Sequence, residues 1–222
     1  MKTGLFAALS LIAAPLAAQE VGIPAGCELR ATLLMPNCEM HQVMHCDGGV
    51  IRTDVYADSI FKGEEQRAGL TAIVWRRGTM LQEVTAQIGD LNAVPALGVG
   101  ETLVVQVERS RRILGDDGGP WVEPFTLTYE RIGSAERELP SGQVIAVTQY
   151  REMSAGTGHE AVDLVVDYSP VFRVPVWREG QLIDPNGAPS SYSDGIAAFY
   201  APEHPAFQTA IAPEDAPCTP EG

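Results

Sequence analysis

The side chains with the most definite chemistry in this sequence are its four cysteines, Cys27, Cys38, Cys46 and Cys218. In an oxidising compartment, four cysteines allow two disulfides in three possible connectivities. We favour Cys27–Cys46 with Cys38–Cys218, because residues 27–46 follow the pattern of a hairpin that places Cys27 opposite Cys46. A Cys38–Cys46 bridge is the alternative. It requires a turn or a helix between the two residues, since eight residues of straight strand span roughly 26 Å.

The same segment could instead bind a metal. It contains Met40, His41, Met44 and His45 between two thiols, and thioether, imidazole and thiolate groups suit copper or zinc. On a helix the two histidines would lie one turn apart and could share an ion. On a strand they lie roughly 13 Å apart, and the methionines point to the opposite face. A metal site therefore requires a helical segment with a free thiol, whereas a strand predicts two core methionines, two solvated histidines and no cofactor.

Catalytic chemistry has few candidate residues. The sequence contains no Gly-x-Ser-x-Gly motif of the kind that positions a nucleophilic serine. His159 lies beside Glu160 after a glycine-rich segment, so a hydrolase that uses His159 with a carboxylate is one hypothesis. A solvated histidine in a hairpin loop is the simpler interpretation. We therefore predict no catalytic residues and favour a protein that is not an enzyme.

Three tryptophans, Trp75, Trp121 and Trp177, fall on segments that read as strands. Aromatic residues at such positions usually belong to an ordinary core. A curved sheet of this size can nevertheless enclose one small ligand. The aromatic residues that could line such a pocket with the tryptophans are Tyr168, Phe172, Phe199 and Tyr200.

The elements that would position these residues are short runs of alternating β-formers separated by Gly, Pro, Asn and Asp. Such runs are typical of an antiparallel all-β domain. Three hairpins are predicted, over residues 27–46, 70–88 and 162–178, and further strands over 102–109, 121–131 and 142–151. We predict a single antiparallel sheet curved into an open or flattened barrel and held by two disulfides.

The hairpins also predict which residues face each other. In the first, Leu29 lies opposite Met44 and Leu33 opposite Met40, which makes one face apolar apart from Gln42. In the second, a turn at Gly78-Thr79 places Arg77 opposite Met80. In the third, closed by Ser169-Pro170-Val171, the pairs are Leu164–Val176, Val166–Val174, Tyr168–Phe172 and Asp167–Arg173. Pro175 predicts an edge or a bulge, because proline cannot donate to the ladder.

The N-terminus has the features of a secretory signal peptide. Lys2 precedes an apolar run from Leu5 to Leu16, and small residues at Ala17 and Ala18 suggest cleavage after Ala18. We therefore predict a signal peptide over 1–18, a β domain over 19–200, and a Pro/Ala/acid-rich tail over 201–222 that Cys218 ties down. Lipidation of Cys27 is an alternative, which the preceding proline and the three cysteines left over argue against.

Charge and hydropathy narrow the class of partner. The chain has 29 acidic and 15 basic residues and a formal net charge of −14. Such a chain repels nucleic-acid phosphates and anionic lipid surfaces. No segment after the signal peptide is apolar enough to span a bilayer. These features predict a soluble periplasmic or secreted protein that does not bind nucleic acid.

Two short motifs give a family resemblance: Leu139-Pro140-Ser141-Gly142 leading into a strand, and Tyr168-Ser169-Pro170 opening the last hairpin. Together with three early cysteines and one late cysteine, they resemble uncharacterised exported β-sheet proteins of alphaproteobacteria. The resemblance covers about a third of the chain, and its two motifs lie between Tyr129 and Trp177. It implies a strongly curved antiparallel sheet and no catalytic residues.

These observations predict a non-catalytic periplasmic binding or envelope-associated protein, which could hold an apolar ligand inside the curved sheet. The first alternative is a metal-handling protein that uses the segment from Cys38 to Cys46. The second is a hydrolase that uses His159.

Overall fold

The computed structural model describes residues 22–156, 161–184 and 186–219. The predicted signal peptide and His159 lie outside the described residues. The described chain forms thirteen strands and two short 3-10 helices. The strands are β1 (Cys27–Leu34), β2 (Met40–Cys46), β3 (Ile51–Ala57), β4 (Ile60–Ala68), β5 (Thr71–Arg77), β6 (Met80–Ile88), β7 (Thr102–Ile113), β8 (Trp121–Glu138), β9 (Val144–Gly156), β10 (Ala161–Ser169), β11 (Val174–Ile183), β12 (Pro189–Gly195) and β13 (Ala198–Tyr200), and the 3-10 helices are η1 (Asp47–Gly49) and η2 (Leu91–Ala96).

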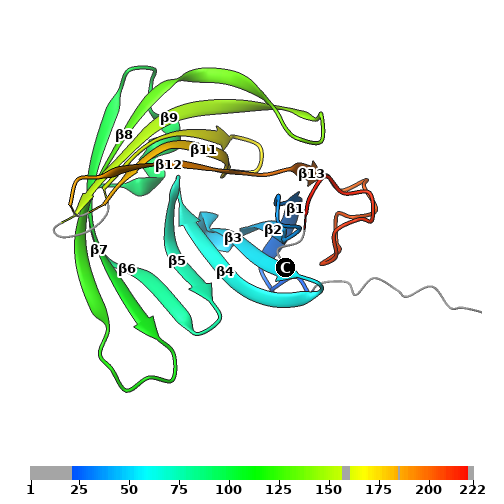
Figure 1. Cartoon of the computed structure of the whole chain (residues 1–222), viewed down its shortest axis with the longest axis horizontal. Helices are drawn as coiled ribbons and strands as arrows, with labels where there is room; N and C mark the ends of the chain where they lie inside the picture. The colour runs from blue at the N-terminus through cyan, green and yellow to red at the C-terminus, as the bar shows by residue number, and fades with distance from the viewer. Residues whose placement is uncertain (1–21, 157–160, 185, 220–222) are drawn as a thin grey trace, which may run out of the picture.

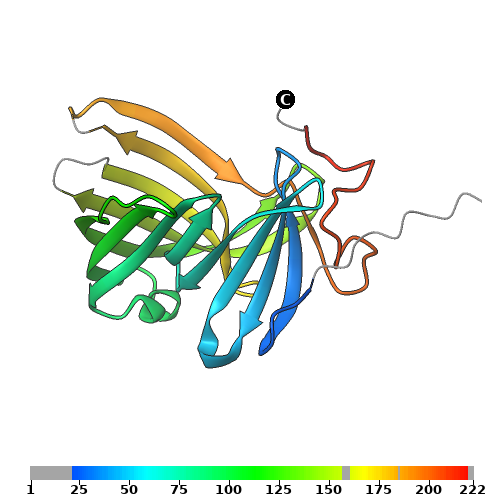
Figure 2. The same ribbon diagram turned by 90° about the horizontal axis from the view of Figure 1, so that it is seen from below.

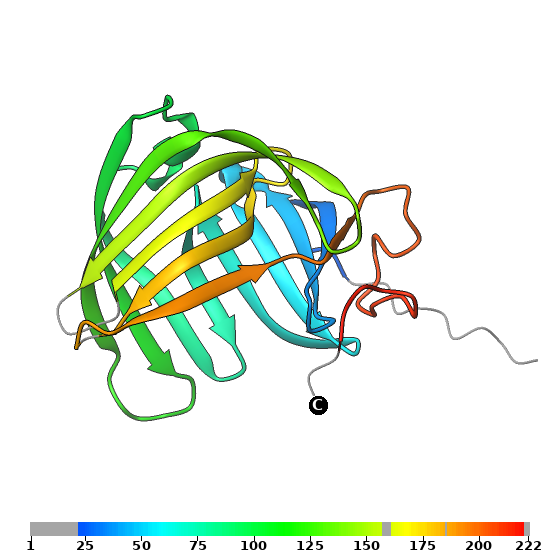
Figure 3. The same cartoon turned by 45° about the horizontal axis from the view of Figure 1, so that its top comes forward.

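All thirteen strands belong to one antiparallel sheet, in which β1 to β12 follow one another in chain order. The last strand, β13, pairs with β1 at the opposite edge from β12. Figure 1 shows the resulting roll of the sheet, and Figure 3 shows β12 in orange running toward β1 and β13. The predicted fold class, a single antiparallel sheet curved into an open barrel, is confirmed.

The link between the two edge strands holds the roll without closing it. Ile196 donates a backbone hydrogen bond to Val176 of β11 at 3.0 Å, and the next residue, Ala197, donates to Leu34 of β1 at 2.7 Å. β13 then pairs with only the last three residues of β1. The sheet is therefore pinned at one end of β1 and remains open along the rest of that strand.

The core consists of separate clusters, in keeping with the two groups of strands that meet at an angle in Figure 2. One cluster joins Leu70 and η2 to the centre of β8, with Leu127 and Tyr129 fully buried. A second joins Ala31 and Leu33 of β1 to β9 and β11.

Among the described residues, none of the helices has the length and the apolar character that crossing a bilayer requires.

The C-terminal tail packs on the face of β1 and β2 that points away from the second cluster. Phe207 contacts Leu29 and Met44, and Ala206 and Ala210 belong to a cluster with Met40. The tail also satisfies the polar side chains on this face: Thr32 donates to the carbonyl of Phe207, and Gln42 Nε2 donates to Thr209 O at 3.2 Å. The tail therefore covers a sheet face that would otherwise expose apolar and polar groups together.

Both favoured disulfides are present. Cys27 and Cys46 are direct partners in the β1–β2 ladder and are bonded, and Cys38 is bonded to Cys218 across 180 residues of sequence. In the first hairpin the pair Leu29–Met44 is as predicted, but Leu33 faces His41 rather than Met40. The reason is a bulge between Leu29 and Ala31, which adds one residue to β1 and moves the following side chains to the other face.

The third hairpin is also longer than predicted. Leu164 pairs with Gly180 and Val166 with Arg178, so the register differs by four residues from the expected one, and Asp167 does not face Arg173. The turn is wider because Phe172 enters the core and its backbone N–H is bound by Ser169 Oγ at 3.2 Å. The bulge expected near Pro175 is confirmed between Asp167 and Tyr168. In the second hairpin, Arg77 does face Met80.

Candidate functional site

A cleft with a volume of about 230 Å³ lies between the inner face of β2–β5 and the strands β11 and β12. One wall follows from the strand register. His41, Val55, Gly63 and Arg77 are successive partners across β2, β3, β4 and β5. Because directly paired residues point to the same face, these four positions form one row on the cleft wall.

A second row lies beside the first. Thr53, Glu65 and Trp75 are successive partners across β3, β4 and β5, and all three line the cleft. The opposite wall consists of residues 174–178 of β11 and 194–196 at the end of β12. The cleft thus brings together side chains that are more than 100 residues apart in sequence.

Two glycines allow close contacts within the walls of the cleft. A Cβ atom on Gly63 would lie 2.0 Å from the carbonyl oxygen of Arg76, so only glycine fits between β4 and β5 at this point. A Cβ atom on Gly195 would lie 2.1 Å from Cε3 of Trp177. The Trp177 ring therefore lies directly against the β12 backbone, and Arg137 stacks over it with its guanidinium carbon 5.1 Å from the ring centroid. These contacts fix the orientation of the ring on the cleft wall.

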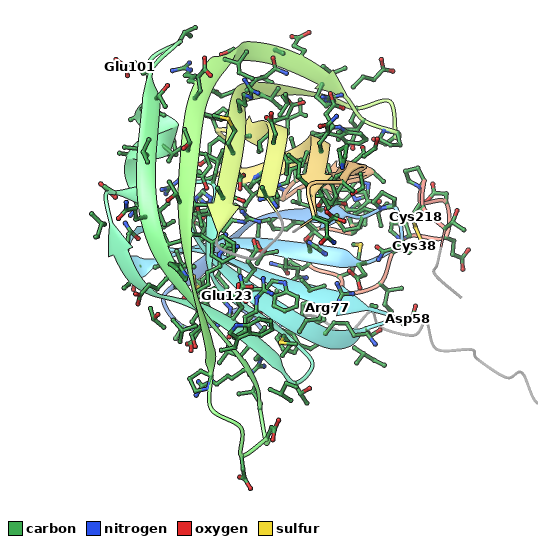
Figure 4. The ribbon with its side chains drawn as sticks, turned by 60° about the vertical axis from the view of Figure 1, so that its left-hand side comes forward. Cys38, Asp58, Arg77, Glu101, Glu123 and Cys218 are labelled. Atoms are coloured by element: carbon green, nitrogen blue, oxygen red, sulfur yellow. A yellow bond between two sulfur atoms is a disulfide. The ribbon has the colours of Figure 1, made fainter. Side chains whose placement is uncertain are left out.

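Most charged groups around the cleft are paired. Arg77 forms an ion pair with Glu39, Arg67 forms one with Glu65, and Glu64 is held by Arg52 at 2.6 Å. Figure 4 shows Arg77 on the sheet and Cys38 beside Cys218, where the tail meets it. Because they are paired with one another, these carboxylates and guanidiniums mainly stabilise the wall of the cleft.

Glu39 is the carboxylate with the clearest electrostatic role. Its Oε2 lies 3.6 Å from His41 Nε2, and its Oε1 accepts from Arg77. The neighbouring imidazole lowers the pKa of Glu39; burial opposes this shift, and the charge of Arg77 adds to it. Glu39 thus stays ionised and holds Arg77 at the edge of the cleft.

Replacing Glu39 with glutamine is expected to cost about 1 kcal/mol at pH 7, because it removes a charge-assisted hydrogen bond to a half-exposed arginine. A group whose folded-state pKa is lowered stabilises the fold above its unfolded pKa of about 4.3 and loses this effect as the pH falls through the folded value. The difference between wild type and E39Q should therefore shrink below pH 4. Urea unfolding at pH 7 and pH 3 measures it. A constant difference at both pH values would contradict the assigned role.

A second polar group lies deeper, behind the cleft. Tyr129 is fully buried, shares a hydrogen bond with Thr71, and has its pKa raised by burial and by the charge of Glu152. Glu152 also attracts Arg109 and Arg178. These side chains come from β5, β7, β8, β9 and β11, so the interior of the roll is strongly polar at this level.

The predicted metal residues are separated by the fold. They lie on strand β2, with Met40 and Met44 buried under the tail and His41 and His45 on the other face. His41 lines the cleft, and His45 Nε2 lies 3.1 Å from Phe172 O, so the histidines are not solvated as expected. Cys38 and Cys46 are both in disulfides. The helix and the free thiol that a metal site requires are therefore missing, and the described residues hold no group of three His, Cys, Asp or Glu placed to bind a metal.

The predicted aromatic residues divide between the cleft and the core. Trp75 and Trp177 line the cleft, whereas Trp121 does not. Phe172 and Phe199 pack against each other in the core, and Tyr200 stacks on His204 of the tail. Sequence reasoning missed Arg67 and Arg178, which also line the cleft. Arg178 is the partner of buried Val166 in the β10–β11 ladder. The alternation of side chains could therefore have indicated Arg178, but only if the register of the last hairpin had been predicted correctly.

Comparisons with known proteins give one distant structural neighbour. No family model and no curated protein matches the sequence. Among solved structures, the hypothetical lipoprotein YmcC of Escherichia coli (K12) aligns over 81% of this chain and 86% of its own, with 10% identity and a TM-score of 0.45. A similarity of this size carries no functional argument, and the resemblance to exported alphaproteobacterial proteins stays a prediction.

Proposed function

We propose that this chain is a non-catalytic binding protein of the periplasm or cell envelope, and that it holds a small ligand in the cleft between β2–β5 and β11–β12. The observation that carries the proposal is the cleft itself, which is about 230 Å³ in volume and bounded by Trp75 and Trp177. Small-molecule sites typically combine apolar and aromatic walls with a few placed polar groups. A cleft of this size suits a ligand smaller than a typical drug molecule.

The disulfides support a location outside the cytoplasm. Both bridges lie within a domain that has a substantial core, and such bonds persist mainly in oxidising compartments. The signal peptide predicted over residues 1–18 agrees with this location. Association with the cell envelope is part of the proposal.

The cleft lining changes the expected chemistry of the ligand. Apolar residues such as Leu33, Val55 and Ile196 alternate with Arg67, Arg178 and other polar groups. A wholly apolar ligand would dehydrate these charged groups and would leave Arg178 Nε without a hydrogen-bond partner, which costs free energy. The cleft therefore suits a ligand with an apolar body and a polar end better than the apolar ligand expected from the sequence.

The test is native mass spectrometry of the mature protein purified from the periplasm of its own host. We expect a bound mass that leaves under denaturing conditions. Val55→Trp, which fills the cleft, should abolish it, and Val144→Trp on the exposed outside of β9 should not. If wild type carries no bound mass, or if V55W keeps it, the proposed site is wrong.

A further inference from the structure

Arg178 is the charged residue of the cleft whose guanidinium is incompletely bound. It lies on β11 between Val166 of β10 and Asp194 of β12, and it is one of the residues that line the cleft. Its Nε atom is buried and has no hydrogen-bond partner within the described part of the chain. A buried N–H without a partner is unfavourable, because the hydrogen bond that it made to water in the unfolded chain is not replaced, so an acceptor is expected at this position.

The other arginines of the inner wall differ from Arg178 in this respect. Arg67 forms its ion pair with Glu65 and donates through Nη1 to Leu70 O at 2.6 Å. Arg77 is bound to Glu39. Arg76 also lines the cleft, and its guanidinium carbon lies over the Phe61 ring, 5.7 Å from the ring centroid. Among the described cleft residues, Arg178 is thus the arginine that combines a buried N–H without an acceptor with the absence of a salt bridge.

The charges that face Arg178 keep it ionised. Burial opposes the charged form, but Glu152 of β9 and Glu65 of β4 outweigh it and raise the pKa of Arg178. Tyr129 of β8 and Tyr192 of β12 also face it, and Arg67 is close enough for Arg178 to lower the pKa of Arg67. Oε2 of Glu152 is itself buried without a hydrogen-bond partner among the described residues, so it does not satisfy Arg178 Nε.

An anionic group fits this position best. A guanidinium presents a planar fork of N–H donors that matches a carboxylate or a phosphate. A bridging water could satisfy one N–H, but the adjoining cleft of about 230 Å³ is much larger than the roughly 30 Å³ that one water occupies. Trp75 of β5, on the wall facing β11, provides apolar surface in the same cleft.

We propose that the cleft binds a small organic anion, with its carboxylate or phosphate group on the guanidinium of Arg178 and its apolar body along the facing wall that carries Trp75. This inference rests on the proposed function and adds the chemical class of the ligand. It also assigns Arg178 as the residue that selects the ligand by charge.

Three probes with the same ring test the proposal on the mature full chain: benzoate, phenyl phosphate and neutral benzyl alcohol. Calorimetry should show saturable binding of benzoate or phenyl phosphate with a Kd of about 1 mM or below, as expected for ligands with so few atoms. Benzyl alcohol should bind at least tenfold more weakly. The anion that binds with the lower Kd identifies whether the natural ligand carries a carboxylate or a phosphate.

Variants then assign the binding to Arg178. R178Q should weaken anion binding at least tenfold and leave benzyl alcohol unchanged, and R178K should restore part of the loss, because it keeps the charge without the fork. The control R151Q removes an exposed arginine of β9 and should have no effect. NMR of wild type gives a readout that does not depend on these variants folding: the indole N–H signal of Trp75 should shift with the anion, and that of Trp121 should not.

The outcomes separate the two proposals. If the three probes bind equally and R178Q changes nothing, the cleft binds ligands but the anion proposal is overturned. If neither anion binds wild type or shifts the Trp75 indole signal, the anion proposal is overturned too. If the probes bind but V55W does not affect them, the cleft is the wrong site and the proposed function fails.

Discussion

Replacing Arg137 with alanine is expected to lower the free energy of unfolding by about 3–5 kcal/mol, because it leaves a buried carboxylate without its cation. Asp167 is only 1% exposed, and its Oδ2 accepts from Arg137 Nε at 2.6 Å. Gln149 donates to the other oxygen at 2.9 Å and would remain as its single side-chain partner. Arg137 also stacks on Trp177, so R137A should loosen the cleft wall as well.

The chain contains a matched control for this prediction. Arg151 binds Asp163 with two hydrogen bonds of 2.8 and 2.7 Å, but their side chains are 46% and 39% exposed. Exposed ion pairs contribute little to stability, because water and salt screen their charges. Urea unfolding followed by circular dichroism should therefore separate R137A from R151A by at least about 2 kcal/mol. Equal effects of the two substitutions would show that burial of Asp167 does not determine the energy of its ion pair.

Removing the Cys38–Cys218 disulfide by a C38A/C218A double substitution is expected to cost about 2–4 kcal/mol. The bridge closes a loop of 180 residues, and it anchors the tail that covers Met40, Met44 and Leu29. Release of the tail would also leave Thr32 and Gln42 on that face without their present acceptors. The tail should then become sensitive to protease while the sheet stays folded.

Limited proteolysis with mass spectrometry, together with urea unfolding, measures both effects. The C27A/C46A variant is the control, because its bridge lies within the β1–β2 ladder and does not hold the tail. It should lose stability without rapid cleavage after residue 200. If the tail of C38A/C218A remains as resistant as that of wild type, its packing on β1 and β2 suffices and the bridge is not its anchor.

Sequence reasoning was accurate where alternation and covalent geometry act together. The Cys27–Cys46 pairing follows from the period of two residues along each strand. Once these two cysteines are paired, Cys38 and Cys218 remain to form the second disulfide. The β-bulges could not be predicted from the sequence. The extra residue at Arg30 reverses the faces of the rest of β1, and it is tolerated because tail carbonyls satisfy Thr32 and Gln42. That compensation comes from residues about 175 positions away and has no local signal.

The cleft illustrates the same limit. Trp75 and Trp177 were predicted as possible pocket residues from their type, and His41 only as a metal ligand. Arg178 was not predicted, because the register of its hairpin was four residues off and an arginine on a strand normally faces solvent. Which side chains meet inside a rolled sheet depends on bulges and on the order of the edge strands. Neither can be derived from the alternation of one segment.

The measurement that tests the account most directly is a crystal structure of the mature protein purified from its own periplasm without added ligand. We expect density for a non-protein molecule between β2–β5 and β11–β12, with an acceptor atom within hydrogen-bond distance of Arg178 Nε and an apolar part near Trp75. A cleft that contains only water, with Arg178 Nε bound directly to Glu152, would contradict it.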